Sequence, residues 1–305
     1  MQNTYENFTH TFAGNPLDRG QHLRRDEQTI TALAASEAAR YLPFNKLKVA
    51  TLDTGALHWC ALAHLPEQAA DPVFLGTLDD APHFAVNLSL DDADSASNDF
   101  TFTDCRVAAS TLSVAEAGIV SQARALLDWH KRNPYCAQCA QPTRMGRGGL
   151  VRHCDQCARH IFPRTDPVAI MLIQDAIDGD RCLLGKSQGR MATSNFYSAL
   201  AGFVDQGESL EEAVRREVFE EAGIRVGNVT YHSSQPWPFP SSLMIGCQGI
   251  ALDHDIVIDP TEMADVAWFS RAEARAGLEG TNPDLRVPGA QAIAHHLIKT
   301  WAYAK

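Results

Sequence analysis

The chain has 305 residues, enough for two or three domains, and its 45% hydrophobic and 21% charged residues are typical of an ordinary globular protein. The net charge of −11 repels nucleic acid in bulk, so any contact with nucleic acid must be local. No run approaches the roughly 18 apolar residues of a membrane span, and the N-terminus lacks the basic and apolar regions of a secretory signal, so we expect no membrane span and a cytoplasmic location.

The first 112 residues alternate short apolar runs with turn residues, which is typical of strands in an α/β or β-rich domain. We expect strands at residues 48–52, 58–63, 73–76 and 83–88. This part of the chain carries no chemistry that the sequence identifies. A helix is expected over residues 113–132, where apolar residues recur at helical spacing. Its apolar face consists of Ile119, Val120, Ala123, Leu126 and Leu127.

Two Cys-x-x-Cys pairs follow this helix, Cys136 with Cys139 and Cys154 with Cys157, and 14 residues separate them. Four thiolates at this spacing can surround a zinc ion as a tetrahedron, and the glycines between the pairs suit a tight hairpin turn. Two structural disulfides are the competing interpretation, which a cytosolic setting disfavours. Because protein fills all four positions, we expect one structural zinc ion per chain, in a linker helix and ribbon at residues 113–165.

Zinc ribbons often bind nucleic acid, which raises a rival function. This ribbon carries four arginines, Arg144, Arg147, Arg152 and Arg159. It lacks an aromatic platform of the kind on which single strands stack.

The remaining residues, 166–305, predict a second α/β domain. Residues 168–173 and 181–185 are apolar runs expected of central strands, and residues 256–258 and 266–269 predict further strands. Residues 290–303 predict an amphipathic helix that packs on the sheet.

An acidic helix lies between these strands. Ser209 and Glu212 form a capping-box pair at its start, and Gly223 stands where a helix-ending glycine is expected. Its apolar stripe consists of Leu210, Ala213, Val214 and Val218.

Three glutamates of this helix predict a metal site. Glu217 and Glu221 project from the apolar stripe and Glu220 from its edge, whereas a solvated acidic face, the alternative interpretation, would place them opposite. Carboxylates on a buried side are costly without a partner. Hard oxygen ligands suit Mg²⁺ or Mn²⁺, and a phosphate anhydride is the substrate that such metals help to cleave.

The segment resembles the Nudix box. The matching positions are Gly202, Glu208, Arg216, Glu217, Val218, Glu220, Glu221, Gly223 and Ile224. The resemblance implies a loop–helix–loop in an α/β/α sandwich that hydrolyses nucleoside diphosphates linked to a further group. It also implies that Glu217, Glu220, Glu221 and the Ala201 carbonyl bind metal, and that Arg216 and Glu208 brace the loop.

A second motif, from Ser234 to Met244, contains three alternating prolines that hold the backbone extended. Trp237 and Phe239 stand on this stiff frame. Their rings suit stacking on a nucleotide base, and a rigid structural loop around a small aromatic core is the alternative.

This run is similar to the Ser-Gln-Pro-Trp-Pro-Phe-Pro-x-Ser signature of the NADH pyrophosphatase branch of Nudix hydrolases. That branch also has a four-cysteine ribbon before the Nudix domain, and the resemblance implies a Nudix-like N-terminal domain. It implies that Glu262 completes the metal site, although a solvated carboxylate is the alternative. The residues implied to contact the substrate are Phe162, Gln235, Pro236, Trp237, Pro238, Phe239, Pro240, Ser241, Ser242 and Ala294. Phe162 stands where relatives often have tyrosine, and it lacks the tyrosine hydroxyl.

The sequence therefore predicts an α+β or α/β chain with an N-terminal α/β domain (1–112), a small zinc ribbon (113–165) and a C-terminal Nudix sandwich (166–305). The predicted activity is metal-dependent hydrolysis of NADH or NAD⁺ to AMP and nicotinamide mononucleotide. The resemblance also allows removal of NAD caps from RNA 5′ ends, and suggests a homodimer. The alternatives are a pyrophosphatase for ADP-ribose or another nucleotide conjugate, and a non-catalytic nucleic-acid-binding protein on a Nudix scaffold.

Overall fold

The computed structural model describes residues 10–66, 69–88, 90, 99–177, 179–189 and 192–304. The first nine residues, to which the prediction about a secretory signal refers, lie outside this set. The chain divides into two compact units, which are described separately. Unit 1 comprises Met1–His10, Asp166–Gln235 and Ser242–Lys305, and unit 2 comprises Thr11–Thr165 and Pro236–Ser241.

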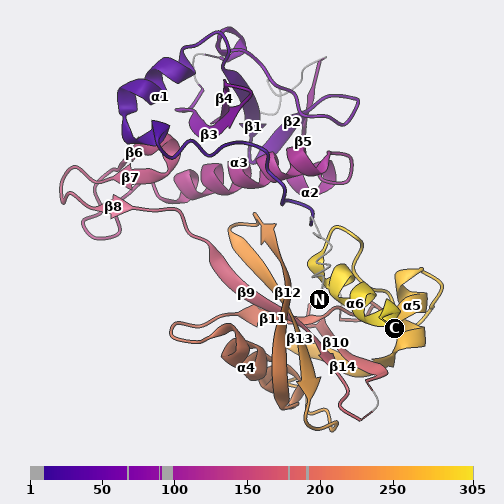
Figure 1. Ribbon diagram of the computed structural model, residues 1–305. Helices are drawn as coiled ribbons and strands as arrows, with labels where there is room; N and C mark the ends of the chain where they lie inside the picture. The colour runs from indigo at the N-terminus through magenta and orange to yellow at the C-terminus, as the bar shows by residue number, and fades with distance from the viewer. Residues whose placement is uncertain are drawn as a thin grey trace, which may run out of the picture. The chain divides into compact units, whose positions relative to one another are not determined.

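Unit 2 contains a five-stranded sheet in the order β3-β4-β1-β2-β5 (Figure 1). The strands are β1 Arg40–Asn45, β2 Lys48–Thr51, β3 Val73–Leu78, β4 Ala81–Asn87 and β5 Thr101–Thr103. β1 and β4 pair in parallel, and the other neighbours are antiparallel. Side chains alternate between two cores, because Leu42 and Phe44 enter one and Tyr41 enters the other.

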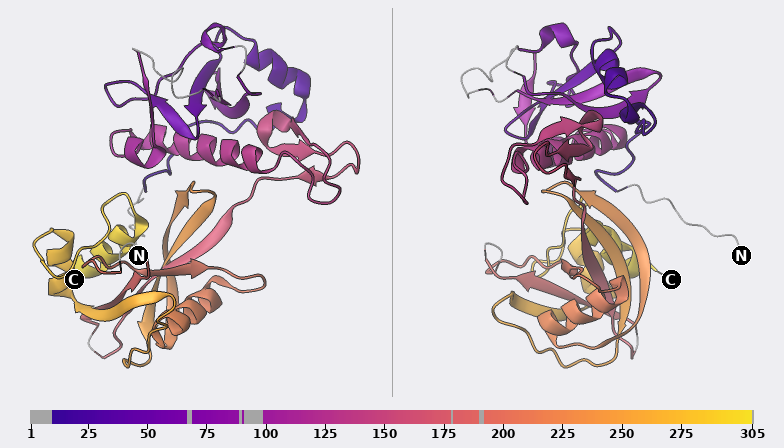
Figure 2. Two further views of the ribbon diagram at one scale, coloured as in Figure 1. Left: turned by 180° about the vertical axis from the view of Figure 1, so that it is seen from behind. Right: turned by 90° about the vertical axis from the view of Figure 1, so that its left-hand side faces the viewer.

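Helices cover this sheet. Among the described residues they are η1 Leu23–Arg25, α1 Glu27–Ala34, η2 Leu62–His64, α2 Cys105–Ala108 and α3 Val114–Arg132. α3 begins at a capping box of Ser113 and Glu116 and runs along the sheet (Figure 2). The five apolar residues predicted for its inner face all lie in the same core as Leu42, so that prediction is confirmed.

The strand predicted at residues 58–63 is wrong. Cys60 forms a single bridge with Tyr41, and Leu57 forms one with Thr51, so the segment touches two strands without building a ladder along either. The chain then turns into η2.

The ribbon forms a three-stranded antiparallel sheet of β6 Arg144–Gly146, β7 Val151–His153 and β8 His160–Ile161. The predicted hairpin turn lies between β6 and β7 at η3, Arg147–Gly149. All three turn residues have positive φ, at 50°, 57° and 95°, which explains the two glycines.

Unit 1 contains a sheet in the order β12-β13-β9-β10-β14, with β11 also paired to β9. The strands are β9 Asp166–Gln174, β10 Arg181–Ser187, β11 Leu200–Phe203, β12 Val226–Trp237, β13 Ser242–Ala251 and β14 Met263–Ser270. β9 pairs with β13 in parallel and with β10 and β11 in antiparallel orientation.

Helices lie on both faces of this sheet, which gives the predicted α/β/α sandwich (Figure 1). α4, Leu210–Ala222, packs on one face, and α5, Arg271–Leu278, and α6, Ile293–Tyr303, pack on the other. β9 is buried on both sides, because Met171 and Ile173 contact the α4 core while Ile170 and Leu172 contact the α6 core. This burial explains its continuous apolar run.

The strand predicted at residues 256–258 is also wrong, because these residues cap a helix instead. The amide of Val257 donates to the Ala222 carbonyl at 2.8 Å, and Ile256 and Ile258 pack on the α4 core. The predicted C-terminal helix begins at Ile293, three residues later than expected.

Candidate functional site

The acidic helix forms as predicted. The side chain of Ser209 accepts from the Glu212 amide, and the Glu212 side chain accepts from the Ser209 amide. The helix ends at Gly223, whose φ of 69° is left-handed. The segment therefore runs from β11 through a short loop into α4, which contains all three box glutamates.

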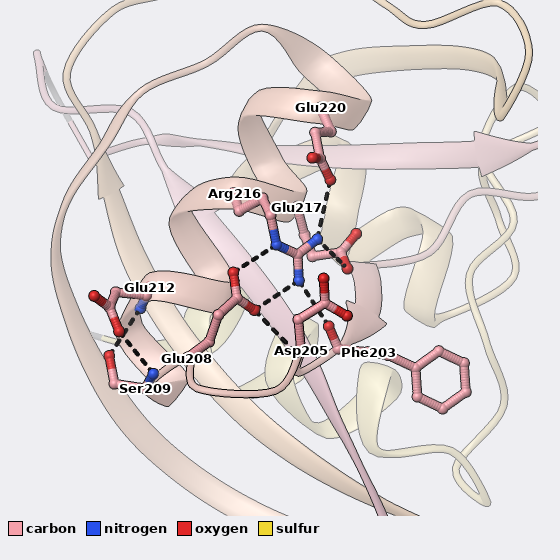
Figure 3. Close-up of polar contacts among 8 residues, drawn as sticks. All are labelled: Phe203, Asp205, Glu208, Ser209, Glu212, Arg216, Glu217 and Glu220. Carbon is pink, nitrogen blue, oxygen red and sulfur yellow. Dashed lines mark hydrogen bonds and ion pairs between the residues drawn. The ribbon is translucent and has the colours of Figure 1, made fainter.

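Arg216 organises the loop and the outer side of the helix (Figure 3). Its Nε and Nη2 donate to the two carboxylate oxygens of Glu208 at 2.6 and 2.8 Å, and Nη2 also donates to the Phe203 carbonyl at 2.8 Å. Nη1 donates to Glu217 at 2.8 Å and to Glu220 at 3.0 Å. Hydrogen bonds from Arg216 lower the pKa of Glu208 to about 2, so this pair stays ionised and ties the loop to the helix.

Glu217 is packed against β11. A Cβ atom added to Gly202 would lie 1.8 Å from the carboxyl carbon of Glu217, so glycine at this position leaves room for the carboxylate where it lies. The Glu217 side chain is 12% exposed, and burial raises its pKa. The position of the Glu217 carboxylate against β11 thus depends on the missing side chain at Gly202.

Glu221 is the most deeply buried glutamate of the helix. It is 8% exposed, and among the described residues no partner bonds to its buried Oε2. Burial, together with the charges of Glu217, Glu262 and Glu220, raises its pKa to about 8. An unpartnered carboxylate oxygen among other carboxylates is the donor that a divalent cation would satisfy.

The other expected metal ligands lie around these residues. Glu220 is 54% exposed and bonds to Arg216. Glu262 precedes β14, and the amide of Gln188 donates to its carbonyl at 2.8 Å. Its exposed side chain is close enough to raise the pKa of Glu217 and Glu221. Ala201 pairs with Ile170 in the sheet.

The four ribbon cysteines form a tight cluster. Their ligand atoms all lie within 4.8 Å of one another, and three sulfur–sulfur distances are 3.4, 3.6 and 3.7 Å. Disulfides are excluded, because a bonded pair lies about 2.05 Å apart. Four sulfurs about 2.3 Å from a central zinc ion would be about 3.8 Å apart, so the cluster fits zinc. The box glutamates form no comparably tight group among the described residues.

The expected substrate residues are divided between the two units. Gln235, Ser242 and Ala294 belong to unit 1, whereas the rest of the aromatic loop and Phe162 belong to unit 2. Gln235 is 1% exposed and fixes the start of α6, since its Oε1 accepts from the Ile293 amide at 2.9 Å. Its Nε2 donates to the Gln291 carbonyl at 2.8 Å. Ala294 is buried in the first turn of α6.

Phe162 is 56% exposed and lies at a cavity of about 460 Å³ within unit 2. Three arginines, Arg24, Arg25 and Arg147, also line this cavity. Arg24 is 2% exposed and donates to the carbonyls of Phe74 and Gly148, so it is a structural member of the wall.

Three family models match the chain in succession. The NADH pyrophosphatase-like rudimentary NUDIX domain matches residues 26–129 and the NADH pyrophosphatase zinc ribbon domain matches residues 131–162. The NUDIX domain matches residues 163–288. The NAD-capped RNA hydrolase NudC of Mycobacterium bovis is 32% identical over 93% of this chain and 92% of its own length. The chain belongs to the Nudix hydrolase family.

Two further relatives cover less of their own length. The human NAD(P)H pyrophosphatase NUDT13, mitochondrial, is 37% identical over 72% of this chain and 67% of the relative. The NAD-capped RNA hydrolase NUDT12 of Macaca fascicularis is 44% identical over 61% of this chain, and the match spans only 42% of that protein. The N-terminal domain, the ribbon and the Nudix sandwich of the expected fold are all confirmed. No helix in the described part of this Nudix chain is long and apolar enough to cross a membrane.

Some residues that contact the Nudix motifs carry no signal in the sequence. Arg106 and Arg124 lie over the ring of Phe239, and Phe12 contacts it edge-on. They are far from the motif along the chain, and isolated arginines and phenylalanines are common on helices and in loops. Only the fold brings them to the loop.

Replacing Gly202 with alanine is expected to displace the Glu217 carboxylate from β11 of the Nudix box. The atoms that meet the added methyl group are the carboxylate end of a flexible side chain, which can turn away, so we expect a cost near the lower end of overpacking, about 1 kcal/mol. Urea unfolding measures the loss. Gly289→Ala is the matched control, because nothing lies within 4 Å of its added Cβ. Equal stability of the two variants would contradict the predicted clash.

Proposed function

We propose that this chain hydrolyses the pyrophosphate of NADH or NAD⁺ and releases AMP and nicotinamide mononucleotide. The observation that carries the proposal is the buried Glu221 carboxylate of a complete Nudix box, one oxygen of which has no partner in the part of the chain that the structure describes. The choice of substrate is supported by the motif at residues 234–244 and by relatives named NAD(P)H pyrophosphatase and NAD-capped RNA hydrolase.

Glu217, Glu220, Glu221, Glu262 and the Ala201 carbonyl are the proposed ligands for Mg²⁺ or Mn²⁺. When bound, these ions supply positive charge at the phosphates and make the attacking water more acidic. The reaction adds one water molecule across the bridge between the two phosphorus atoms, so each product carries a terminal phosphate. The proposed base that accepts the proton from this water is Glu220, Glu221 or Glu262.

The other residues of the site have distinct proposed roles. Arg216 and Glu208 hold the loop against the helix through their two-fold ion pair. Gln235 fixes the start of α6, and Ala294 then lines the dinucleotide site. Residues 236–242 and Phe162 are the remaining proposed contacts with the dinucleotide. The cysteine cluster holds one structural zinc ion.

We also propose that the protein is a homodimer, that it is cytoplasmic, and that its domain boundaries lie near residues 112 and 165. Light scattering on purified protein tests the homodimer, since a homodimer has twice the 33.4 kDa mass of one chain.

The test is to incubate the protein with NADH and Mg²⁺ or Mn²⁺ and to identify the products by mass spectrometry. AMP and reduced nicotinamide mononucleotide in equal amounts support the proposal. Parallel reactions with NAD⁺, ADP-ribose and RNA carrying a 5′ NAD cap rank the substrates. A capped-RNA activity is the second candidate, because two relatives carry that name. Binding of nucleic acid without hydrolysis, in metal-free buffer, would instead favour the non-catalytic alternative.

The pKa of Glu221 predicts that stability falls as pH rises in protein that carries zinc alone. Burial raises this pKa from 4.5 to about 8, so the folded state keeps a proton that the unfolded state releases near pH 4.5. The folded state therefore binds more protons between these values, and its stability declines across that window. At 1.36 kcal/mol per pH unit, the full loss is at most about 5 kcal/mol above pH 8.

Urea unfolding of wild-type protein and Glu221→Gln after passage over a chelating resin checks this prediction. The variant should be more stable by roughly 2–4 kcal/mol near pH 9 and lose that advantage near pH 5. Added Mn²⁺ should stabilise the wild-type protein and leave the variant largely unchanged. The same pH slope for both proteins would contradict the predicted proton uptake.

A further inference from the structure

The tip of the aromatic loop, Pro236–Ser241, is in contact with two arginines of unit 2. The guanidinium carbon of Arg106, on α2, lies 3.8 Å from the centre of the Phe239 ring, and that of Arg124, on α3, lies 4.4 Å from it. Arg124 also donates a hydrogen bond to the Pro238 carbonyl. A cation within about 6 Å of a ring centre is attracted to it by about 0.5–2 kcal/mol.

Two other aromatic rings pack against Phe239. The Phe12 and Trp237 rings contact it edge-on, with centres 5.5 and 5.4 Å away. Phe12 is 3% exposed and packs with Ala109 and Ala117 in the same small core. The half-buried Phe239 ring is therefore packed against protein side chains.

The contact with the Phe239 ring also stabilises the two arginines. Neither arginine forms an ion pair among the described residues, although two acidic groups lie on the same helices. Asp104 caps α2 by accepting from the Arg106 amide at 2.8 Å, and Asp128 accepts from Arg132 at 3.0 Å. Burial lowers the pKa of Arg124, whereas the charge of Asp128 raises it and the charge of Arg106 lowers it. The electron-rich ring face adds a favourable contact for both partly desolvated guanidinium groups.

The other end of the motif is fixed separately, through the hydrogen bonds of Gln235 to the start of α6. Between Gln235 and the Phe239 anchor lie three residues, two of them prolines with restricted backbones.

We propose that Arg106 and Arg124 are positioning residues, which hold Phe239 and so fix the backbone of the motif that contacts the substrate. The effect on substrate binding rests on the proposed function, whereas the holding of the loop does not. Neither arginine touches the substrate in this proposal. They act through Phe239 and the Pro238 carbonyl.

The experiment compares the double variant Arg106→Ala/Arg124→Ala with Arg106→Lys/Arg124→Lys and with the control Lys131→Ala, which removes an exposed cation from the same helix α3. Hydrogen exchange of residues 233–245 measures loop order, and NADH kinetics measure its consequence. Loss of two cation–π contacts should speed exchange and raise KM by about tenfold or more, with kcat changed by less than about threefold. The lysine variant should recover most of both, because it keeps the cations over the ring.

Each outcome bears on one claim. Wild-type exchange and KM in the double alanine variant would overturn the inference, as would equal effects in Lys131→Ala or equal losses in the double lysine variant. A fall in kcat with unchanged KM would show general disturbance and also overturn it. If wild-type protein fails to hydrolyse NADH but the alanine variant exchanges faster, the proposed function fails and the holding of the loop stands.

Discussion

Glu221→Gln is expected to lower kcat for NADH hydrolysis by about three orders of magnitude or more, in line with the loss of a key electrostatic group. The substitution keeps the size of the side chain and removes the charge that would bind a divalent cation. Glu221 is the glutamate whose buried oxygen has no partner among the described residues, so no other interaction compensates for the loss. Steady-state kinetics at saturating Mg²⁺ and Mn²⁺ measure the effect.

The control for this variant is Glu211→Gln, in the first turn of the same helix, where the carboxylate is exposed and is not one of the matching positions of the box. It should keep wild-type turnover. Near-normal turnover of the Glu221 variant would remove this residue from the mechanism. The pH–rate profiles of Glu220→Gln and Glu262→Gln then distinguish the candidate bases, since loss of the base removes the acidic limb of the profile.

Cys154→Ser is expected to abolish zinc binding and unfold the ribbon. Cys154 is 1% exposed, and its sulfur lies 3.4 Å from that of Cys139, so no water can take its place without opening the cluster. A structural zinc site of this kind contributes about 10–16 kcal/mol of binding free energy near neutral pH, and the small ribbon sheet has little core of its own. Metal analysis should give one zinc ion in wild-type protein and none in the variant.

Limited proteolysis should then cleave the variant within residues 131–162, the matched ribbon segment. Cys60→Ser is the control, because Cys60 is buried in the N-terminal core and outside the cluster. It should keep its zinc ion. A Cys154 variant that retains full zinc and resists the protease would exclude the four-sulfur site.

The sequence predicted most elements of this fold where periodicity and capping agree. The box helix, its Ser209 cap and the inner face of α3 follow from local spacing, and all are observed. The two strands that were wrong, residues 58–63 and 256–258, are short, mostly apolar runs. An apolar run indicates burial in a core, but it does not decide whether the backbone pairs with a neighbouring strand or packs at a helix end.

For the candidate site too, the sequence predicted the part that depends on residues close together in the chain. The Nudix box and the cysteine spacing identify a carboxylate site and a zinc ribbon, because their ligands lie close together in the chain. Residue types at fixed spacing on one helix or hairpin determine such sites by themselves. Even the close approach of Gly202 to Glu217 is specified within the box.

Only the tertiary structure decided what surrounds these side chains. It made Glu221 the buried carboxylate and Glu220 the exposed one, and it surrounded Phe239 with Arg106 and Arg124. The physical reason is that burial, pKa and cation–π contacts depend on groups that the fold brings together from distant parts of the chain, whereas periodicity and spacing report only on near neighbours.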